Sequence, residues 1–298
     1  MKKLITIFIL SAMTLIVTQA QQIKTGLPFL KLSADARSSA MGEAFTSITN
    51  DHSSYYYNPA SIRFSNLRQL MISHRQGFSE TTTDYIGATI PGETFTFGLS
   101  AYTTSVNDIE VRLRPGEAEG TFGARNGAIG VGAAISLSDE MTVGLTGKLL
   151  YEKIYTDEAS GYGIDAGFFY KAFDNVNIGV SLLNFGSMSV LRSERSVLPT
   201  TIRLGASYST LFTPDFSLLF AGDAVKTLDD EITHLHFGTE AVYDSMFMIR
   251  AGYQTGYEVK SFTGGVGIAY GIIRFDYAFV PMKNAFSPNH TFSLTFLL

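Results

Sequence analysis

The sequence has 298 residues, a formal net charge of −5, only 16% charged residues, and neither Cys nor Trp. Soluble domains usually carry about 25% charged residues, so an ordinary water-facing surface is disfavoured, and the lack of Cys excludes disulfides and thiolate metal sites. Mild acidity without basic clusters argues against nucleic acid as a partner. Phe (23), Tyr (15) and Gly (28) are abundant instead.

The first twenty residues have the pattern of a cleavable export signal. Lys2 and Lys3 precede an apolar core at residues 4–17, and small residues ending at Ala20 form a cleavage site. We expect cleavage after Ala20, which removes two lysines and takes the formal charge from −5 to −7. A membrane anchor is the alternative, but the apolar core is short. No later apolar run reaches the roughly 18 residues of a transmembrane helix.

Residues 21–65 are irregular in pattern. The small residues from 33 to 45 predict a short helix, with Ser33 as its N-cap and Asp35 favoured near the positive helix end. Gly42 weakens the later part of this helix. Pro59 disfavours helix at Asn58 and predicts a turn before the first strand.

From about residue 66 to the end, apolar and polar residues alternate. The alternation is clear at residues 95–101, 141–152, 202–208, 247–253 and 273–279. Successive side chains of a strand point to opposite faces, so each stretch predicts a two-faced strand. Breakers such as Pro91-Gly92 and Asp174-Asn175 separate the strands.

A soluble β-sandwich and a transmembrane β-barrel both fit this alternation. One face carries large aromatic residues, the other carries Gly, Ser, Thr and isolated charges, and an export signal precedes them; these features favour an antiparallel transmembrane barrel. Residues 66–298 contain 14 or 15 candidate strands. Bacterial single-chain barrels have even strand numbers, so we predict 14 strands. The predicted inward face carries several charged residues: Lys148, Glu152, Arg203, Arg250, Arg274 and Asp276.

The last nine residues predict a closing strand. Phe292, Leu294, Phe296 and Leu298 share one face up to the chain end. This pattern resembles the terminal signal by which outer-membrane proteins are recognised for assembly, with Leu298 in place of the usual aromatic residue. Exposed edges with such an apolar face invite aggregation, so an ordinary edge strand is disfavoured.

The irregular region carries a family resemblance. Phe29-Leu30-Lys31, the run from Asp35 through Arg37, Met41 and Gly42 to Ala44, and Asn58-Pro59-Ala60 resemble the N-terminal signature of the PorV/PorQ family of FadL-like outer-membrane β-barrels. After the export signal at 1–20, the resemblance implies a lumen plug at 21–65 and a 14-stranded barrel at 66–298. It also implies a place in the type IX secretion system of Bacteroidota, whose PorV-like barrels receive secreted proteins.

The residue types of this signature suit a plug. Small residues between 34 and 42 allow close packing inside a narrow lumen. Arg37 is expected to pair with an acidic lumen residue, and the candidates are Glu152, Glu240 and Asp276. We interpret the signature residues as structural rather than as ligand contacts; they are Asp35, Arg37, Met41, Gly42, Asn58, Pro59 and Ala60.

No catalytic constellation, metal site or cofactor site is predicted. His234 and His236 lie two apart on one strand face, and Glu240 is the one acidic residue nearby on that face. Two polar residues facing a wet lumen explain this pair better than metal binding. The glycine-rich runs at 127–132 and 264–267 lack the dinucleotide fingerprint and are interpreted as strand glycines facing a plug or a barrel bend. We therefore expect no enzyme activity.

Three functions remain open from the sequence. The leading hypothesis is an outer-membrane barrel that binds secreted proteins or secretion components at its extracellular rim. A FadL-like channel for hydrophobic small molecules is the alternative, and a structural envelope protein is the third. Outer-membrane lipid is an expected partner in each case. Four segments are long enough to form binding loops: 104–125, 155–161, 185–199 and 281–290.

Overall fold

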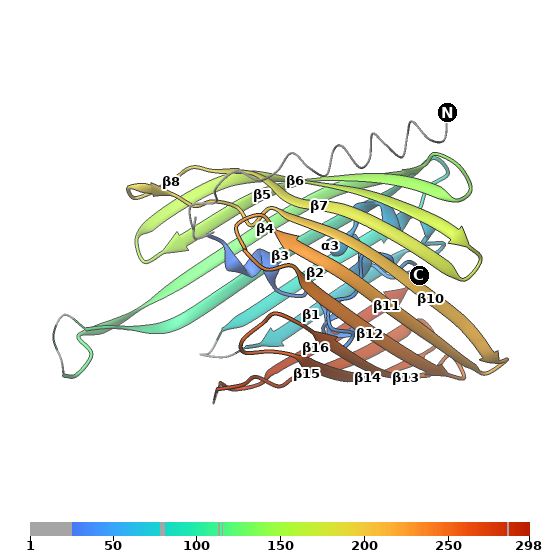
Figure 1. Ribbon diagram of the computed structural model, residues 1–298. Helices are drawn as coiled ribbons and strands as arrows, with labels where there is room; N and C mark the ends of the chain where they lie inside the picture. Colours follow the sequence, from blue (N-terminus) through green and yellow to red (C-terminus); the bar gives the residue numbers. More distant parts are fainter. Residues whose placement is uncertain (1–25, 78–80, 113, 115, 285) are drawn as a thin grey trace.

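The computed structural model describes residues 26–77, 81–112, 114, 116–284 and 286–298. Fourteen antiparallel strands form one closed barrel around a buried N-terminal segment (Figure 1). This confirms the predicted fold class and strand number. The predicted signal peptide and its cleavage after Ala20 lie outside the described residues. Within the described part of the chain, no helix combines the length and apolar character needed to cross a bilayer.

The barrel strands follow chain order around the wall, and β1 pairs with β16 to close it. The barrel strands are β1 (Gln69–Gln76), β2 (Thr82–Ile90), β3 (Phe95–Val111), β4 (Gly120–Ser136), β5 (Met141–Ile154), β6 (Asp157–Phe173), β7 (Val176–Met188), β10 (Thr201–Thr213), β11 (Phe216–Thr227), β12 (His234–Tyr243), β13 (Phe247–Gln254), β14 (Phe262–Tyr270), β15 (Ile273–Val280) and β16 (Asn289–Leu297). A separate hairpin joins β8 (Val190–Leu191) to β9 (Glu194–Arg195) in the connection between β7 and β10.

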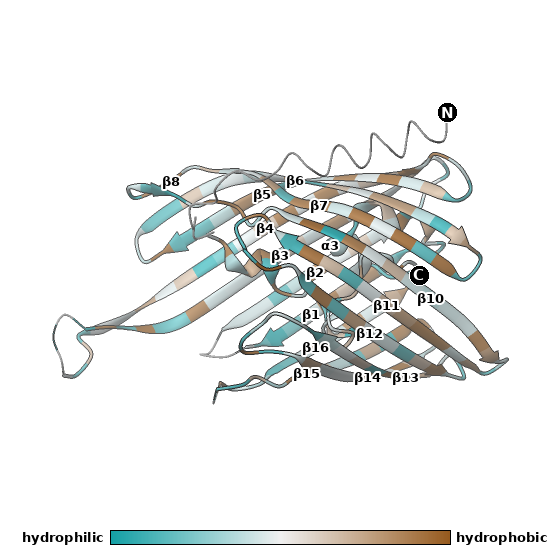
Figure 2. Ribbon diagram, in the orientation of Figure 1, coloured by the Kyte–Doolittle hydropathy of each residue, from teal (hydrophilic) through white to brown (hydrophobic). Residues whose placement is uncertain are grey.

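Hydrophilic and hydrophobic residues alternate along the barrel strands, as the period of two predicted (Figure 2). On β5, Leu145 and Leu149 point outward and are 62% and 71% exposed, whereas Thr146 and Glu152 are buried inside. The outward face is apolar because it meets lipid, and the inward face is polar because it meets the N-terminal segment. Each predicted inward charge lies on the inner face, so the predicted registers are confirmed.

The two rims differ in the length of their connections. At the rim that holds Leu298, connections between strands are two to four residues long, such as 174–175 and 214–215. The opposite rim carries longer connections, including 112–119 and 189–200. Outer-membrane barrels have short periplasmic turns and longer extracellular loops, so the rim with the longer connections is the extracellular one. The prediction of a long loop at residues 155–161 is wrong. Tyr155 and Thr156 form a tight turn, and β6 begins at Asp157.

The N-terminal segment contains four short helical elements inside the wall. These are η1 (Pro28–Lys31), α2 (Ala36–Ala40), α3 (Ser53–Tyr57) and η2 (Pro59–Phe64). The predicted helix at 33–45 is shorter than expected, and Asp35 rather than Ser33 is its N-cap, because the Asp35 carboxylate accepts hydrogen bonds from the backbone N–H groups of Arg37 and Ser38. The Ser33 hydroxyl bonds Arg75 and Ser39 instead.

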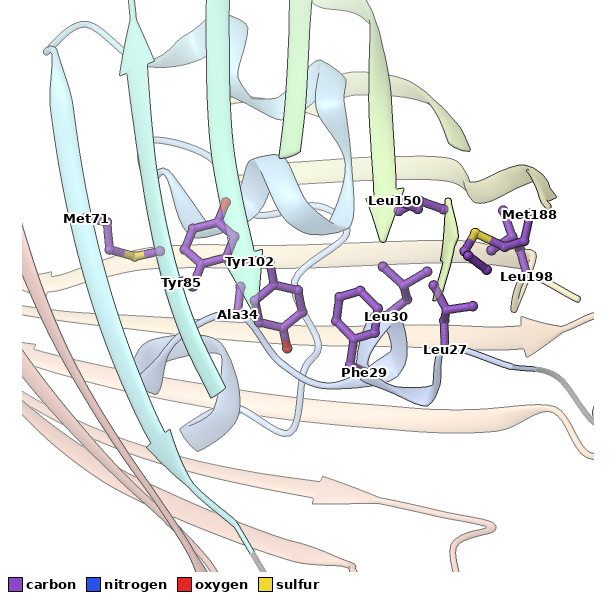
Figure 3. Packing of buried hydrophobic residues seen from close by; sticks show 11 residues of the cluster. Leu27, Phe29, Leu30, Ala34, Met71, Tyr85, Tyr102, Leu150, Met188 and Leu198 are labelled. Atoms are coloured by element: carbon purple, nitrogen blue, oxygen red, sulfur yellow. The ribbon is translucent and has the colours of Figure 1, made fainter. Parts of the chain in front are cut away.

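The largest apolar cluster lies between this segment and the wall, in the extracellular half of the barrel (Figure 3). Leu27, Phe29 and Leu30 project from the segment and are at most 4% exposed. They pack against side chains from β1 to β7 and the β9–β10 connection: Met71, Tyr85, Tyr102, Leu150, Met188 and Leu198. Phe29 and Tyr102 hold their ring centroids 5.4 Å apart. Burial of this apolar surface fixes the start of the segment against the wall.

Candidate functional site in the barrel lumen

Residues 26–65, here called the inner segment, are bound to the barrel wall by buried charges. Arg37 of α2 donates from Nη2 to Glu240 Oε1 of β12 at 2.6 Å, and from Nη1 to Asp51 Oδ2 at 2.7 Å. Glu240 was among the partners predicted for Arg37, so that expectation is confirmed. Of the other two candidates, Glu152 accepts a hydrogen bond from Ser196 and Asp276 binds two other arginines.

Arg37 belongs to a closed ring of three arginines and three carboxylates. Starting from Arg37, the salt bridges run through Glu240, Arg250, Asp276, Arg274 and Asp51 and return to Arg37. Arg37 and Asp51 come from the inner segment, and the other four residues come from β12, β13 and β15. Charges alternate around the ring and cancel. All six side chains are at most 11% exposed, so the ring depends on each member being paired.

Asp51 is the second residue of the inner segment in this ring, and it binds both Arg37 and Arg274. Burial alone would raise the pKa of its carboxyl group, but the guanidinium groups of Arg274 and Arg37 outweigh that effect and lower the pKa below its usual range. Its Oδ1 atom also accepts the backbone N–H of Ser53 at 2.8 Å. The same carboxylate therefore starts α3 and neutralises two arginines.

A second charged contact lies on the neighbouring wall. Asp223 Oδ2 of β11 accepts the backbone N–H groups of Phe45 and Thr46 and the Thr46 hydroxyl, at 2.6 to 3.1 Å. Arg203 of β10 pairs with the same oxygen at 2.8 Å and lies over the ring of Tyr57. The bend at residues 45–46 is thereby held by a charge-assisted cluster.

The Asn58-Pro59-Ala60 motif fits against β5, β6 and β7. The Asn58 side chain accepts the N–H of Ala60 and donates to the carbonyl oxygens of Thr46 and Phe168. Asn58 is extended, as predicted, but Pro59 begins the 3-10 helix η2 (Pro59–Phe64) where a simple turn was expected before the first strand. A Cβ atom on Gly144 would lie 2.5 Å from the carbonyl carbon of Pro59, so only glycine permits this close approach.

Met41 and Gly42 make an equally close contact with β12 and β13. Gly42 has a φ of 62°, in the left-handed region that glycine adopts without strain. A Cβ on Gly252 would lie 2.2 Å from the Gly42 nitrogen, and Met41 is fully buried beside Gly238. Among the predicted strand glycines, Gly265 faces Ala40 in the same way. The signature residues thus gather where the inner segment touches the wall.

A cavity of about 280 Å³ remains between η1 and the wall near the extracellular rim. Its apolar part is formed by Leu30, Leu183 and Val225, beside the rings of Tyr56 and Tyr57. The charged residues and histidines that line it are Lys31, Glu43, Arg203, Asp230, His234, His236 and Lys260. Pockets for small ligands are typically about 300–1,000 Å³, so this cavity is slightly smaller than that range.

His234 and His236 line this cavity and have other partners. His234 bonds Asp230 at 2.9 Å and the Thr255 carbonyl at 3.0 Å, and its ring stacks on Tyr257. His236 bonds the Tyr257 hydroxyl, and Glu240 is held by two arginines. Across the described ranges, no group of three or more His, Cys, Asp or Glu side chains is arranged to hold a metal.

Two hairpins of the extracellular rim lie within predicted loop segments. β3 and β4 extend beyond their neighbours and form the longest projection of the molecule (Figure 1). The second hairpin is β8–β9, in which Val190 is 49% exposed. Two of the predicted loop segments, 104–125 and 185–199, therefore consist largely of strands. The segment at 281–290 is mostly irregular until β16 begins at Asn289.

The predicted closing strand is β16. Phe292, Leu294 and Phe296 point outward from it, because the alternating residues Thr291, Ser293 and Thr295 are buried. Leu298 follows the strand and exchanges backbone hydrogen bonds with Arg68. These four residues lie where the barrel closes, between β15 and β1.

Asp51 and Asp223 were not singled out from the sequence. Neither lies in a recognisable motif, and Asp51 is 14 residues from its partner Arg37 along the chain. The one available signal for Asp223 was an isolated acidic residue among small and apolar residues in a predicted strand. That pattern indicates an inward charge that needs a partner.

Comparisons with known proteins agree with this geometry. The model of the family described as "Type IX secretion system protein PorV" matches residues 16–229. A search of curated proteins found no match. Similar solved structures include the CymD monoaromatic hydrocarbon channel (TM-score 0.66, 12% identity, covering 89% of this chain and 98% of that chain) and the Pseudomonas putida toluene transporter TodX (TM-score 0.62, 12% identity, 93% and 98%).

The Ralstonia pickettii toluene transporter TbuX is similar too (TM-score 0.60, 13% identity, 89% and 98%). At these identities the solved structures show a shared fold, that of FadL-like outer-membrane barrels. The family model covers well over half of the chain. This chain therefore belongs to the PorV family of type IX secretion system outer-membrane β-barrels.

Proposed function

We propose that this barrel binds secreted proteins or other secretion components at its extracellular rim, with the inner segment acting as a fixed plug. In this proposal the chain catalyses no reaction. The observation that carries the proposal is the closed ring of six buried charges between the inner segment and the wall. A ring of this kind fixes the segment in one position and places paired charges between it and strands β12, β13 and β15.

The rim supports the same proposal. The β3–β4 hairpin projects far beyond the wall, and its tip carries exposed charged residues of both signs, including Glu110, Arg112 and Glu119. Projecting strands with polar tips are accessible to proteins outside the membrane. Binding residues are often placed on such connecting segments, because a rigid barrel positions them while the tip stays free to vary.

The test is purification of the native protein from outer membranes in gentle detergent, followed by mass spectrometry of the accompanying polypeptides and lipids. In the hairpin variant, Asn-Gly replaces residues 107–123 between Val106 and Ala124, which face each other in the ladder. In the control variant, Asn-Gly replaces Pro214-Asp215 at the periplasmic rim, between the paired residues Thr213 and Phe216.

We expect secreted proteins or secretion components to accompany the native and control chains and to be lost from the hairpin variant. If the hairpin variant retains as much secreted protein as the native chain, binding occurs at another surface. Enriched apolar molecules without stoichiometric protein would contradict the proposal.

The second candidate is a channel for hydrophobic small molecules. The cavity beside Leu30, Leu183 and Val225 favours it, and the similar solved structures are hydrocarbon channels. The ring of charges opposes it, because a hydrocarbon passing the ring would have to separate paired buried charges. If Val225→Trp, which fills the cavity, removes an apolar molecule that purifies with the native chain, this candidate gains support.

A further inference from the structure

The outer wall carries a groove of about 470 Å³ that the proposed function does not use. It crosses β1 to β5 on the lipid-facing side. The side chains that form its walls on the lipid-facing side are mostly large and apolar: Ile72, Ile86, Ile129, Leu149 and Tyr151. Ile129 and Leu149 are 60% and 71% exposed, so their side chains project from the barrel surface beside the groove. The volume lies within the range of small-molecule pockets.

The groove exists because small residues interrupt a row of large ones. Ala101 and Gly127 point outward on β3 and β4, and each is flanked by larger side chains on the adjacent strands. Ala101 pairs with Ile86 and Ile129, and Gly127 pairs with Tyr151. In a bilayer this hollow must be filled by hydrocarbon, because an empty gap forfeits the dispersion contacts of its lining.

The extracellular end of the groove is polar. The His74 ring bonds Asp84 at 2.7 Å there, and Thr103 lies beside the pair. The next row towards the extracellular rim places Arg125 directly opposite Lys153. A lipid that lies in this groove therefore has its hydrocarbon against the apolar walls and its headgroup level with these residues.

At this end of the groove, Lys153 and His74 have acidic partners, whereas Arg125 has none in the described part of the chain. Lys153 binds Glu158 at 2.6 Å, and His74 binds Asp84. Arg125 is exposed, and its side chain forms no hydrogen bond or ion pair with any described residue. An unpaired guanidinium at a membrane interface favours a phosphate group, which it binds through two parallel N–H donors.

We propose that this groove is a binding site for one phosphate-bearing lipid of the outer leaflet. The acyl chain lies in the hollow over Ala101 and Gly127, and the phosphate binds Arg125 beside Lys153. The leaflet follows from the position of the polar end, which points towards the rim with the longer connections. The site lies on the opposite side of the wall from the lumen, so it does not depend on the rim-binding function.

Two variants separate the acyl and phosphate contacts. Gly127→Leu fills the hollow, and the new Cβ has 3.7 Å to its nearest neighbour, the Tyr102 carbonyl oxygen, so the fold accommodates it. Arg125→Gln removes the phosphate contact and leaves the hollow open. The matched controls are Ala206→Leu on the outward face of β10 and Arg192→Gln in the exposed turn between β8 and β9. The heat-dependent gel mobility of the barrel checks folding.

Native mass spectrometry of the purified full barrel measures the bound lipid, with phosphatidylglycerol and diacylglycerol of the same acyl chains as probes. We expect one phosphatidylglycerol per barrel, and Arg125→Gln should weaken its binding at least about ten-fold, because both charge-assisted hydrogen bonds to the phosphate are lost. The same variant should leave diacylglycerol unchanged, whereas Gly127→Leu should weaken both lipids and the controls neither.

Equal phosphatidylglycerol affinity in the native chain and in either groove variant would overturn the proposal. If Gly127→Leu instead removes a membrane protein that purifies with the native chain and leaves lipid binding unchanged, the groove is a protein interface, which also overturns it.

Discussion

Arg37 links the inner segment to the barrel wall through one guanidinium. It binds Asp51 of its own segment and Glu240 of β12, and through them it joins the arginines of β13 and β15. Its planar fork allows two separate carboxylates to be bound at once, which a lysine ammonium does less well. The arginine of the family-like signature thus has a structural explanation in this chain, independent of any ligand.

Arg37→Ala should lower the free energy of unfolding strongly, because it leaves two buried carboxylates with fewer cations. The expected loss is about 3–5 kcal/mol, the usual result of breaking a buried pair on one side. Urea unfolding of the barrel in lipid vesicles measures it. Arg112→Ala, which breaks the exposed pair with Glu110, is the control and should change stability by at most about 1 kcal/mol. Similar values for both variants would refute the ring as an anchor.

His52 should make stability depend on pH. Its ring is buried between Thr89 and Tyr85, and burial lowers its pKa from 6.5 to about 4, with Asp51 opposing this in part. Between these values the unfolded chain binds a proton that the folded chain refuses, so stability falls as the pH drops from about 6.5 towards 4.

The loss of stability from His52 should reach about 2 kcal/mol at pH 5. The measurement is the urea midpoint of the native chain and of His52→Gln at pH 7 and pH 5. His74→Gln, at an exposed position, is the control. The expectation fails if the native chain and His52→Gln lose the same stability on acidification.

At the scale of elements, the inner segment depends on small residues of the wall. Gly144 of β5 faces the backbone at Pro59, whereas a Cβ atom on Gly147 of the same strand would have no neighbour within 4 Å. The two glycines therefore test the same chemical change on opposite faces of one strand.

Gly144→Val should displace η2 from the wall and expose the inner segment to protease, because the new side chain overlaps the Pro59 backbone. Gly147→Val, on the outward face, should leave digestion unchanged. Limited proteolysis of the folded barrel, followed by mass spectrometry of the fragments, makes the comparison. Resistance of both variants would show that the segment does not depend on this contact.

Much of the barrel was predictable from the sequence, because lipid imposes a period of two on every strand. The inward positions of Arg203, Arg250 and Asp276 followed from that period alone. The turn at Tyr155 and Thr156 was missed, because polar residues there resemble a loop although the strands continue on both sides. The period of two alone does not show that β3 and β4 extend beyond the neighbouring strands.

The contacts of the inner segment were less predictable. Small residues and Arg37 indicated close packing and an acidic partner, but three carboxylates were equally plausible in sequence. The choice of Glu240 depends on which strands the segment passes, and this long-range relation has no local signal. Asp51 and Asp223 were missed for the same reason, since their partners lie 14 to 223 residues away.

At the scale of the whole molecule, the two proposed functions use different parts of the barrel. Protein binding needs the extracellular hairpins, and small-molecule transport needs the cavity beside Val225 and a path past the ring of charges. A change at one part therefore leaves the other intact. The comparison is best made in cells that depend on this chain for secretion.

The most direct test is the amount of secreted protein found outside such cells when the native chain is replaced by the hairpin variant or by Val225→Trp, at equal amounts of folded barrel. The account predicts that export falls with the hairpin variant and is unchanged with Val225→Trp. Full export with the hairpin variant, together with lost export with Val225→Trp, would contradict the account and assign function to the lumen.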